Sequence, residues 1–581
     1  MTDWTLAPRA PQAFFDALRD LHPLTAQILF ARGYLDPAQA HAFLSFEGPR
    51  VDPFSLRDMR LAVERILAAV QRGESVAVYG DYDCDGVTAS ALMMRTLRAL
   101  GANAQVYIPN RFDEGYGLSS EALDVLKTRG AQLVITVDCG TRSMREALHA
   151  REIGLDLIIT DHHELEDGAI PKALAVINPQ RPDCTYGFKK LAGVGVALRV
   201  AQALLRTART AGLAVGSLSE SALLDLVAIG TVADVVELRG ENRRLVNEGL
   251  KRINGAPCPG LQALIKVAGL HAGALTARSI GFTLGPRLNA AGRLETALDA
   301  YHLLECSDED AARASELAGK LDAQNSARQT LTASTARDAE IRALSTVKDG
   351  HPPPLLFAAS DQYNVGVIGL AASRLMEKHY RPAVVVSVSG TEARGSCRSV
   401  NGFDITHALD ECRDLFTKHG GHAAAAGFTL PTGRVNELRG RLSDIVAQQQ
   451  PQGGWQRVIS ADAELELDQL DWQVLSELQQ LEPHGAGNPK PAFVARSARV
   501  QRATRMGKAE GSALGPHLKL ILIDRRGFKW DAVGWHMGEK AGALHEDDSI
   551  DLAFQLGVNE WNGKRQMQLE IMDFRAADKP A

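Results

Sequence analysis

The sequence lacks any apolar run close to the roughly 20 residues that a transmembrane helix needs. Its seven cysteines are scattered, with no CxxC pair and no zinc-like spacing, which fits a reducing compartment. The first residues, MTDWTLAPRAPQAFFDALRD, include acids and lack the apolar core of a signal peptide. We therefore expect a cytoplasmic protein that does not associate with membranes.

The sequence also lacks an excess of basic residues, and its formal net charge is −6. Overall charge thus gives no reason to expect nucleic acid, although a local basic channel remains compatible with it. No Ser/His/Asp or Cys/His arrangement suggests a protein nucleophile. With 581 residues, of which 45% are hydrophobic and 23% charged, the chain is typical of a globular protein of three or four domains.

The most informative stretch is VAVYGDYDCDG, residues 76–86. An apolar run predicts a buried strand, which is followed by Asp81, Asp83 and Asp85 at every second position. Three carboxylates this close repel one another, and divalent cations would relieve that repulsion. The alternative is a solvated acidic turn, since Asp and Gly are common turn residues.

Strands and helices alternate after this stretch. We expect β-branched strands at 76–79, 104–108, 133–137, 157–160 and 174–177, with helices at 61–71, 88–100, 121–129 and 144–152. This alternation predicts an α/β domain with a parallel doubly wound sheet.

Further acids and imidazoles follow the ends of these strands. Asp138 follows the strand at 133–137, the triplet Asp161-His162-His163 follows the strand at 157–160, and Asp234 ends a helix-like run. Sites in parallel sheets form beyond the carboxyl ends of the strands, so these groups can converge. Separately, each acid could cap a helix and each histidine could be a packed residue. Together they favour Mn²⁺ or Mg²⁺, with imidazole tilting the choice towards Mn²⁺.

Two later stretches suggest ligand binding. The first, GFTLGPRLNAAGRL at 281–294, places Arg287 and Asn289 among small residues; its alternative is a loop with solvated arginines. The second, GGHAAAAG at 420–427, includes Gly421 and His422 and is expected to open an alanine-rich helix whose N-terminus favours an anion; its alternative is close helix packing. Ser396 and Arg398 would add donors.

The C-terminal part changes character. Its short strands predict a small antiparallel barrel. Cations and aromatic residues could form a stacking groove there, with core packing of the tryptophans as the alternative: Lys519, Lys529, Trp530, Trp535, Trp561, Lys564 and Arg565.

The motifs GDYDCDG, VDCG, Asp161-His162-His163 and GTVADVV, in this order, resemble those of the DHH phosphoesterase superfamily. Within it, the chain is most similar to the RecJ family of single-strand-specific exonucleases. Several relatives have histidine where this chain has Tyr79, so Asp81 could replace that ligand. The resemblance implies a helical segment (1–45), a DHH domain (46–250), a helical region with a long linking helix (251–350), a smaller α/β DHH-associated domain (351–449) and an OB-like barrel (450–581).

The resemblance also implies roles for individual residues. Asp138 would bridge two ions, Asp81 and Asp83 would bind one of them, and Asp85, His162 and Asp234 the other. His163 would orient a ligand or contact the scissile phosphate, and Asp161 would hold the imidazoles. A 5′-phosphate would be bound by residues of both domains: Arg111, Arg287, Asn289, Ser396, Arg398, Gly421 and His422.

The implied activity is 5′-to-3′ degradation of single-stranded DNA to 5′-mononucleotides in recombination and repair, with two Mn²⁺ or Mg²⁺ ions as cofactors. A single-stranded-DNA-binding protein and a helicase are candidate partners. Two alternatives stay open: a phosphodiesterase for short oligoribonucleotides or cyclic dinucleotides, which would not need the barrel, and a non-catalytic single-strand-binding scaffold.

Overall fold

The computed structural model describes residues 2–47, 51–111, 114, 117–345, 352–507, 515–561 and 563–577, apart from the side chain of Trp561. The chain divides into two compact units. The first unit contains Met1–Arg50, Val236–Asn247 and Arg457–Ala581, and the second contains Val51–Val235 and Glu248–Gln456. None of the described helices is long and apolar enough to cross a bilayer.

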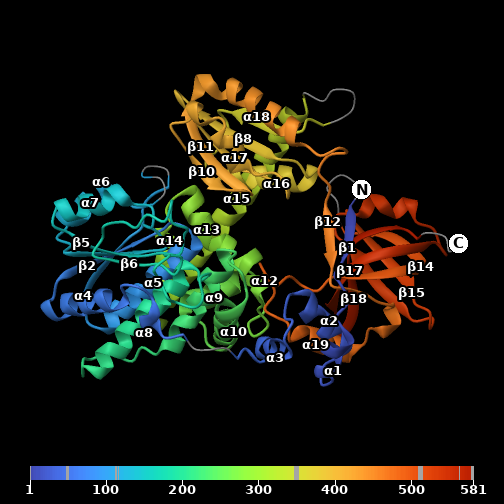
Figure 1. Ribbon diagram of the computed structural model, residues 1–581, viewed down its shortest axis with the longest axis horizontal. Coiled ribbons are helices and arrows are strands. Elements are labelled where there is room, and N and C mark those ends of the chain that lie inside the picture. Colours follow the sequence, from blue (N-terminus) through green and yellow to red (C-terminus); the bar gives the residue numbers. More distant parts are fainter. Residues whose placement is uncertain are drawn as a thin grey trace. The chain divides into compact units, whose positions relative to one another are not determined.

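The second unit begins with a five-stranded parallel sheet of order β3-β2-β4-β5-β6. Helices α6 and α7 lie on one face, and α4, α5 and α8 lie on the other (Figure 1). Apolar strands covered on both faces account for the nearly continuous hydrophobic runs in the sequence. The elements are α4 (Met59–Arg72), β2 (Ser75–Gly80), α5 (Cys84–Ala99), β3 (Asn103–Tyr107), α6 (Ser120–Thr128), β4 (Leu133–Val137), α7 (Met144–Glu152), β5 (Asp156–Thr160), β6 (Ala175–Ile177) and α8 (Gly193–Thr210).

Helices follow this sheet, and they include the long helix that the resemblance implied. This helix, α15, has 34 residues and precedes the second domain of the unit. Its bounds and those of its neighbours are α9 (Leu224–Ala233), α10 (Gly240–Gly255), α11 (Pro259–Val267), α12 (Ala277–Ser279), a π-helical turn η3 (Ile280–Leu284), α13 (Gly285–Leu294), α14 (Leu298–Glu305) and α15 (Ala311–Leu344).

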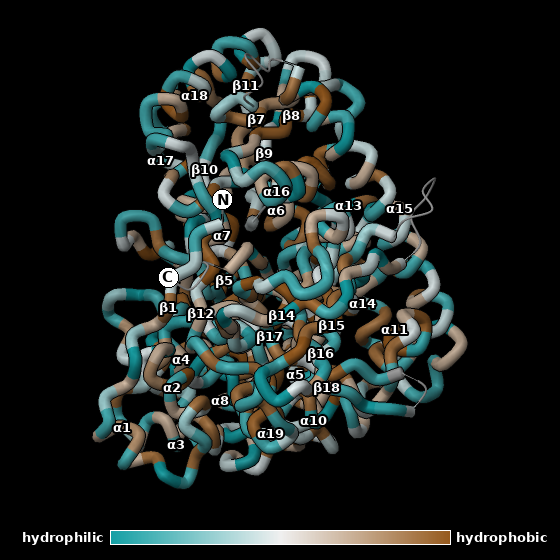
Figure 2. The backbone as a smooth tube through the Cα atoms, turned by 90° about the vertical axis from the view of Figure 1, so that its right-hand side faces the viewer, coloured by the Kyte–Doolittle hydropathy of each residue, from teal (hydrophilic) through white to brown (hydrophobic). Residues whose placement is uncertain are grey.

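A mixed five-stranded sheet of order β10-β11-β9-β8-β7 forms the second domain of this unit. Only β7 and β8 pair in parallel, and their apolar residues appear as brown stretches in Figure 2. The elements are β7 (Leu356–Ser360), α16 (Ile368–His379), β8 (Ala383–Ser389), β9 (Glu392–Arg398), α17 (Ile405–Asp410), β10 (Lys418–His422), β11 (Ala425–Pro431) and α18 (Val435–Gln449).

In the first unit, β14, β15, β16, β18 and β17 close into a barrel through the pairing of β14 with β17. The expectation of a purely antiparallel barrel is wrong in one respect, because β16 and β18 pair in parallel. The elements are β12 (Val458–Ala461), β13 (Ala463–Glu464), α19 (Trp472–Gln479), β14 (Phe493–Met506), β15 (His517–Ile523), β16 (Lys529–Gly534), β17 (Ser549–Trp561) and β18 (Lys564–Ala576).

The N-terminal segment belongs to the same unit as the barrel. Besides α1 (Gln12–Ala17), α2 (Pro23–Ala31) and α3 (Pro37–Ser45), it contains a strand, β1 (Asp3–Leu6), that the helical expectation missed. This strand pairs in parallel with β12. Phe14, Ile28 and Leu29 share one hydrophobic core with residues of α19 and the barrel.

Candidate metal centre and phosphate site

The acidic loop after β2 is fixed by hydrogen bonds at the start of α5. Asp83 caps this helix, since its Oδ1 accepts from the N–H groups of Asp85 at 2.9 Å and Gly86 at 3.0 Å. Asn289 Oδ1 accepts from the N–H of Cys84 at 2.8 Å. Asn289, predicted to bind substrate, therefore braces the acidic loop.

Asp85 is held by the N-terminus of α8. Its two carboxylate oxygens accept from the N–H groups of Gly193 at 2.6 Å and Val194 at 2.9 Å. A Cβ at Gly193 would lie 2.5 Å from Oδ1 of Asp138, so only glycine allows the two acids to share this helix terminus. Sequence reasoning missed Gly193, because its role depends on the approach of α8 to Asp85 and Asp138.

Asp138 leaves the end of β4 with a φ of 62°, a region that non-glycine residues seldom occupy. Its N–H donates to the carbonyl oxygen of Thr160 at the end of the neighbouring strand β5, at 3.0 Å. The sheet therefore holds a strained backbone that keeps this carboxylate buried at the strand ends.

The Asp161-His162-His163 triplet is organised around the carboxylate of Asp161. Asp161 Oδ1 lies 2.7 Å from Nδ1 of His163, and Oδ2 accepts from the N–H of Thr141 at 2.8 Å. Asn178 donates to the carbonyl oxygen of His163, also at 2.8 Å. Although burial alone would lower the pKa of His163, the Asp161 carboxylate raises it to about 9, and in return the imidazolium lowers the pKa of Asp161 despite its burial.

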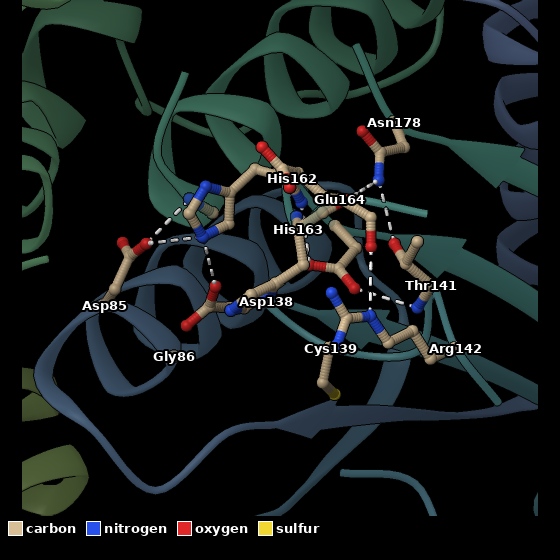
Figure 3. Close-up of polar contacts among 12 residues, drawn as sticks. Asp85, Gly86, Asp138, Cys139, Thr141, Arg142, His162, His163, Glu164 and Asn178 are labelled. Carbon is tan, nitrogen blue, oxygen red and sulfur yellow. Dashed lines mark hydrogen bonds and ion pairs between the residues drawn. The ribbon is translucent and has the colours of Figure 1, made fainter. Parts of the chain in front are cut away.

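The side chains form overlapping groups in which potential ligand atoms lie within 4.8 Å of one another. His162 connects the groups: its Nε2 lies 3.2 Å from Asp138 Oδ1 and 3.6 Å from Asp234 Oδ2. Figure 3 shows this imidazole directed towards Asp85 and Asp138. The groups are Asp81, Asp83 and Asp138; Asp85, His162 and Asp234; and Asp138, Asp161, His162 and His163.

The chemistry of these groups fits divalent cations. Within these groups, four buried atoms make no hydrogen bond with any described residue, namely Oδ1 of Asp81, Oδ1 of Asp138, Nε2 of His162 and Oδ2 of Asp234. Buried polar atoms rarely lack partners, and all four belong to the groups above.

Protonation equilibria support the same conclusion. Burial and neighbouring carboxylates raise the pKa of Asp85 to about 7 and of Asp234 to about 9, and they raise those of Asp81 and Asp138 as well. Burial, followed by His163, lowers the pKa of His162 to about 4, which keeps this imidazole neutral and able to act as a ligand. Bound cations would remove the cost of leaving these carboxylates charged.

Tyr79 lies outside these groups. Its hydroxyl donates to the carbonyl oxygen of Gly117 at 2.9 Å, and its ring stacks on Tyr107 with centroids 5.3 Å apart. Asp81, which belongs to one of the groups, is therefore the better candidate for the ligand that relatives supply at the tyrosine position.

A separate cluster of donors lies in the second domain of the same unit. Arg398 Nη1 donates to Ser396 Oγ at 3.0 Å, and its Nε donates to Ser373 Oγ at 3.1 Å. The first turn of α16 packs against this pair, because a Cβ at Gly369 would lie 3.1 Å from both Ser396 Oγ and Arg398 Nη2. The N-terminus of α16 thus adds a favourable potential for an anion.

The expectation that GGHAAAAG opens a helix is wrong. The stretch forms a hairpin of β10 and β11, in which Gly427 pairs with Ser396 and Ala425 with Arg398 of β9. Small residues fit a helix as well as a strand, and here the pairing with β9 stabilises the strand. Gly421 and His422 lie exposed on β10, so the helix terminus near Arg398 belongs to α16.

Further arginines lie near Arg398, and among them sequence reasoning overlooked Arg328. Burial, then Arg111, Arg328 and Arg398, lowers the pKa of Arg293 to about 10. The guanidinium of Arg111 lies 4.1 Å from the ring centroid of Tyr82. Arg293 lies in the 281–294 stretch, but Arg328 on the long helix α15 has no local motif. Mutual repulsion among these cations favours an anionic ligand.

The side chain of Arg287 contacts helix α15 and the turn η3. Its guanidinium pairs with Oδ1 of Asp322 at 2.9 Å and donates to the carbonyl oxygen of Thr283 at 2.8 Å. Because Asp322 belongs to α15, Arg287 joins α13 to the long helix.

In the barrel, Trp530 is only 3% exposed and packs in the core, so a stacking role for it is wrong. Lys519 pairs with Asp531 at 3.3 Å. Trp535 is 52% exposed and remains available for stacking. Lys529, Lys564 and Arg565 are exposed, and the side chain of Trp561 lies outside the described residues.

Family models match three parts of the chain: the N-terminal domain of the DHH family at 75–231, the DHHA1 domain at 353–448 and the RecJ OB domain at 461–573. The single-stranded-DNA-specific exonuclease RecJ of Bacillus subtilis is 38% identical over 95% of this chain and 68% of its own length. That of Escherichia coli is 36% identical over 89% of this chain and 90% of its own length.

A crystal structure of RecJ from Thermus thermophilus in complex with Mn²⁺ matches with a TM-score of 0.82 at 30% identity, covering 99% of this chain and 80% of that one. A structure of RecJ from the same organism with Mg²⁺ matches with a TM-score of 0.77. These similarities extend over all three matched domains. The chain therefore belongs to the RecJ family of single-stranded-DNA-specific exonucleases.

Proposed function

We propose that this protein hydrolyses single-stranded DNA from the 5′ end to 5′-mononucleotides, using two Mn²⁺ or Mg²⁺ ions, in recombination and repair in the cytoplasm. The observation that carries the proposal is the convergence of four buried ligand atoms without hydrogen-bond partners among the described residues: one each from Asp81, Asp138, His162 and Asp234. The names of the relatives supply the substrate class and the exonuclease activity, and the 5′-to-3′ polarity is what the resemblance to the RecJ family implies.

We assign the ions to two sets of residues: Asp81, Asp83 and Asp138 for one, and Asp85, His162 and Asp234 for the other, with Asp138 shared. When bound, two cations lower the pKa of a water molecule and neutralise charge on a phosphodiester. His163 keeps a proton on Nε2 at neutral pH, because its Nδ1 faces Asp161 and its pKa is about 9. That proton is suited to a phosphate oxygen.

Arginines and helix α16 would hold the terminal 5′-phosphate. Arg398 and Ser396 lie at the first turn of α16. Arg293 interacts electrostatically with Asp83, and Arg111 with Asp81. A terminal phosphate bound there would leave the next phosphodiester for the metal ligands. In the cell, a single-stranded-DNA-binding protein and a helicase would supply this substrate.

The decisive experiment uses single-stranded DNA labelled at either end, with Mn²⁺ or with a chelator. Attack from the 5′ end releases a 5′ label as mononucleotide at once and shortens the 3′-labelled strand progressively. No cleavage with Mn²⁺ would instead support the non-catalytic scaffold.

A phosphodiesterase for short oligoribonucleotides or cyclic dinucleotides is the second candidate. The barrel, which such an enzyme would not need, argues against it. Comparing kcat/KM of the full-length chain on long DNA and on dinucleotides tests this point, and a preference for dinucleotides would favour the second candidate.

A further inference from the structure

The two most exposed large apolar side chains among the described residues belong to segments that adjoin one candidate metal ligand, Asp234. Phe282 is 76% exposed and Val235 is 70% exposed. Val235 directly follows Asp234, and Phe282 lies in the π-helical turn η3. Such exposure is unfavourable unless these side chains have a partner.

The turn η3 packs against the last turn of α9, which ends at Ala233, directly before Asp234. A Cβ at Gly281 would lie 3.6 Å from Cγ1 of Val232, and a Cβ at Gly285 would lie 3.2 Å from Cβ of Ala233. Phe282 lies between these two glycines, so its position is tied to the helix end that carries the metal ligand.

Both exposed side chains are on irregular backbone. Val235 has a φ of 62°, which is a genuine outlier for a β-branched residue. π-Helical turns are rare and are often found at functional sites. Two unusual backbone conformations thus present apolar side chains to solvent beside the metal centre.

The direction of the bound strand follows from the distribution of charge. The guanidinium of Arg111 lies 4.1 Å from the ring centroid of Tyr82, which stands between Asp81 and Asp83 in the chain. A Cβ at Gly292, the neighbour of Arg293, would lie 2.6 Å from the carbonyl oxygen of Tyr82, so these arginines approach the metal centre from the side of Asp81 and Asp83. Asp234 instead belongs to the group that contains Asp85 and His162. A strand with its 5′-phosphate among the arginines would therefore pass Asp234 after the scissile phosphodiester.

We propose that Phe282, together with Val235 and Arg278, binds a nucleobase on the 3′ side of the scissile phosphodiester. This inference rests on the proposed function. The guanidinium of Arg278 lies 5.3 Å from the ring centroid of Phe282, a pairing of cation and aromatic ring that suits bases of any sequence. Phe282 is thus a substrate-positioning residue that acts on the strand that remains after cleavage.

Steady-state kinetics on a 5′-phosphorylated oligothymidylate of about 20 nucleotides test this role. Phe282→Ala should raise KM about five- to tenfold with kcat within about twofold, because one stacking contact is lost. Phe282→Tyr should restore KM. Ile341→Ala, which removes another highly exposed apolar side chain, is the matched control and should leave both constants unchanged.

Fluorescence gives a readout that a purely structural role would not change. In an Asp138→Asn background, 2-aminopurine placed at successive positions from the 5′ end should be quenched at one position, and Phe282→Ala should abolish that quenching. The inference is overturned if quenching persists in Phe282→Ala, or if its KM equals that of the parent chain. Failure of the parent chain to cleave DNA would instead overturn the proposed function.

Discussion

Nε2 of His162 lies 3.2 Å from Oδ1 of Asp138, and neither atom makes a hydrogen bond with a described residue. A charged carboxylate and a neutral imidazole can each bind a cation. His162 is grouped with Asp234, and Asp138 with Asp81, each with potential ligand atoms within 4.8 Å of one another. The pair therefore marks the centre of the proposed metal site, where the two sets of ligands meet.

Replacement of Asp138 should remove activity without unfolding the protein. Asp138→Asn keeps the shape but loses the shared charge, so we expect activity below about 1% of the parent value. With a chelator present, its melting temperature should equal or exceed that of the parent, because a buried carboxylate surrounded by acids is removed. Asp124→Asn, on an exposed acid paired with His149, is the control. Activity above a few per cent would exclude the shared role.

Replacement of Arg398 should weaken the preference for a 5′-phosphate. Charge-assisted hydrogen bonds contribute about 1.5–3 kcal/mol, so the ratio of kcat/KM between phosphorylated and unphosphorylated DNA should fall about tenfold or more in Arg398→Ala. Arg394→Ala is a matched control, because Arg394 lies on the same strand β9 and pairs with Glu392. An unchanged ratio in Arg398→Ala would exclude the phosphate site.

Replacement of Asn289 should act through the acidic loop. Asn289→Ala leaves the N–H of Cys84 without its acceptor, so Mn²⁺ affinity should fall about tenfold or more, as when residues supporting metal ligands are lost. Asn254→Ala removes a similar side-chain contact with Leu275, and it should lower stability without changing Mn²⁺ affinity. Titration calorimetry measures both, and equal affinities in the two variants would contradict the bracing role.

The stability of the metal-free protein should decrease as pH rises. The pKa of Asp85 is about 7 and that of Asp234 about 9 in the folded chain, against an ordinary value of 3.8. A carboxyl whose pKa is higher in the folded chain than in the unfolded chain stabilises the fold fully at pH values below its unfolded pKa. This stabilisation is lost as the pH rises from about 4 through 9. Thermal unfolding in a chelator should thus give a falling melting temperature over this range.

Added Mg²⁺ should reverse this trend. Cations bind the deprotonated carboxylates, so the stabilisation they provide should grow as pH rises through the same window, with release of protons. A chelated protein that is equally stable at about pH 5.5 and 8.5 would contradict the raised pKa values.

The parallel sheet and the convergence of side chains at the ends of its strands could be predicted, because β-branched runs and the acids that follow them in the sequence are local patterns. Asp138 and His162 lie where that rule places them. The hairpin at 420–427 could not be predicted, since glycine and alanine suit helix and strand alike until β9 provides pairing partners. Arg328 was missed because its contribution depends on the approach of α15 to Arg293, which leaves no local pattern.

The shared core of the N-terminal helices and the barrel has a consequence for synthesis. Phe14, Ile28 and Leu29 emerge from the ribosome before their packing partners, such as Leu475 and Phe554, which follow more than four hundred residues later. Until then these apolar side chains are open to chaperones and proteases. A prematurely terminated polypeptide would keep these apolar side chains uncovered even with every proposed metal ligand present.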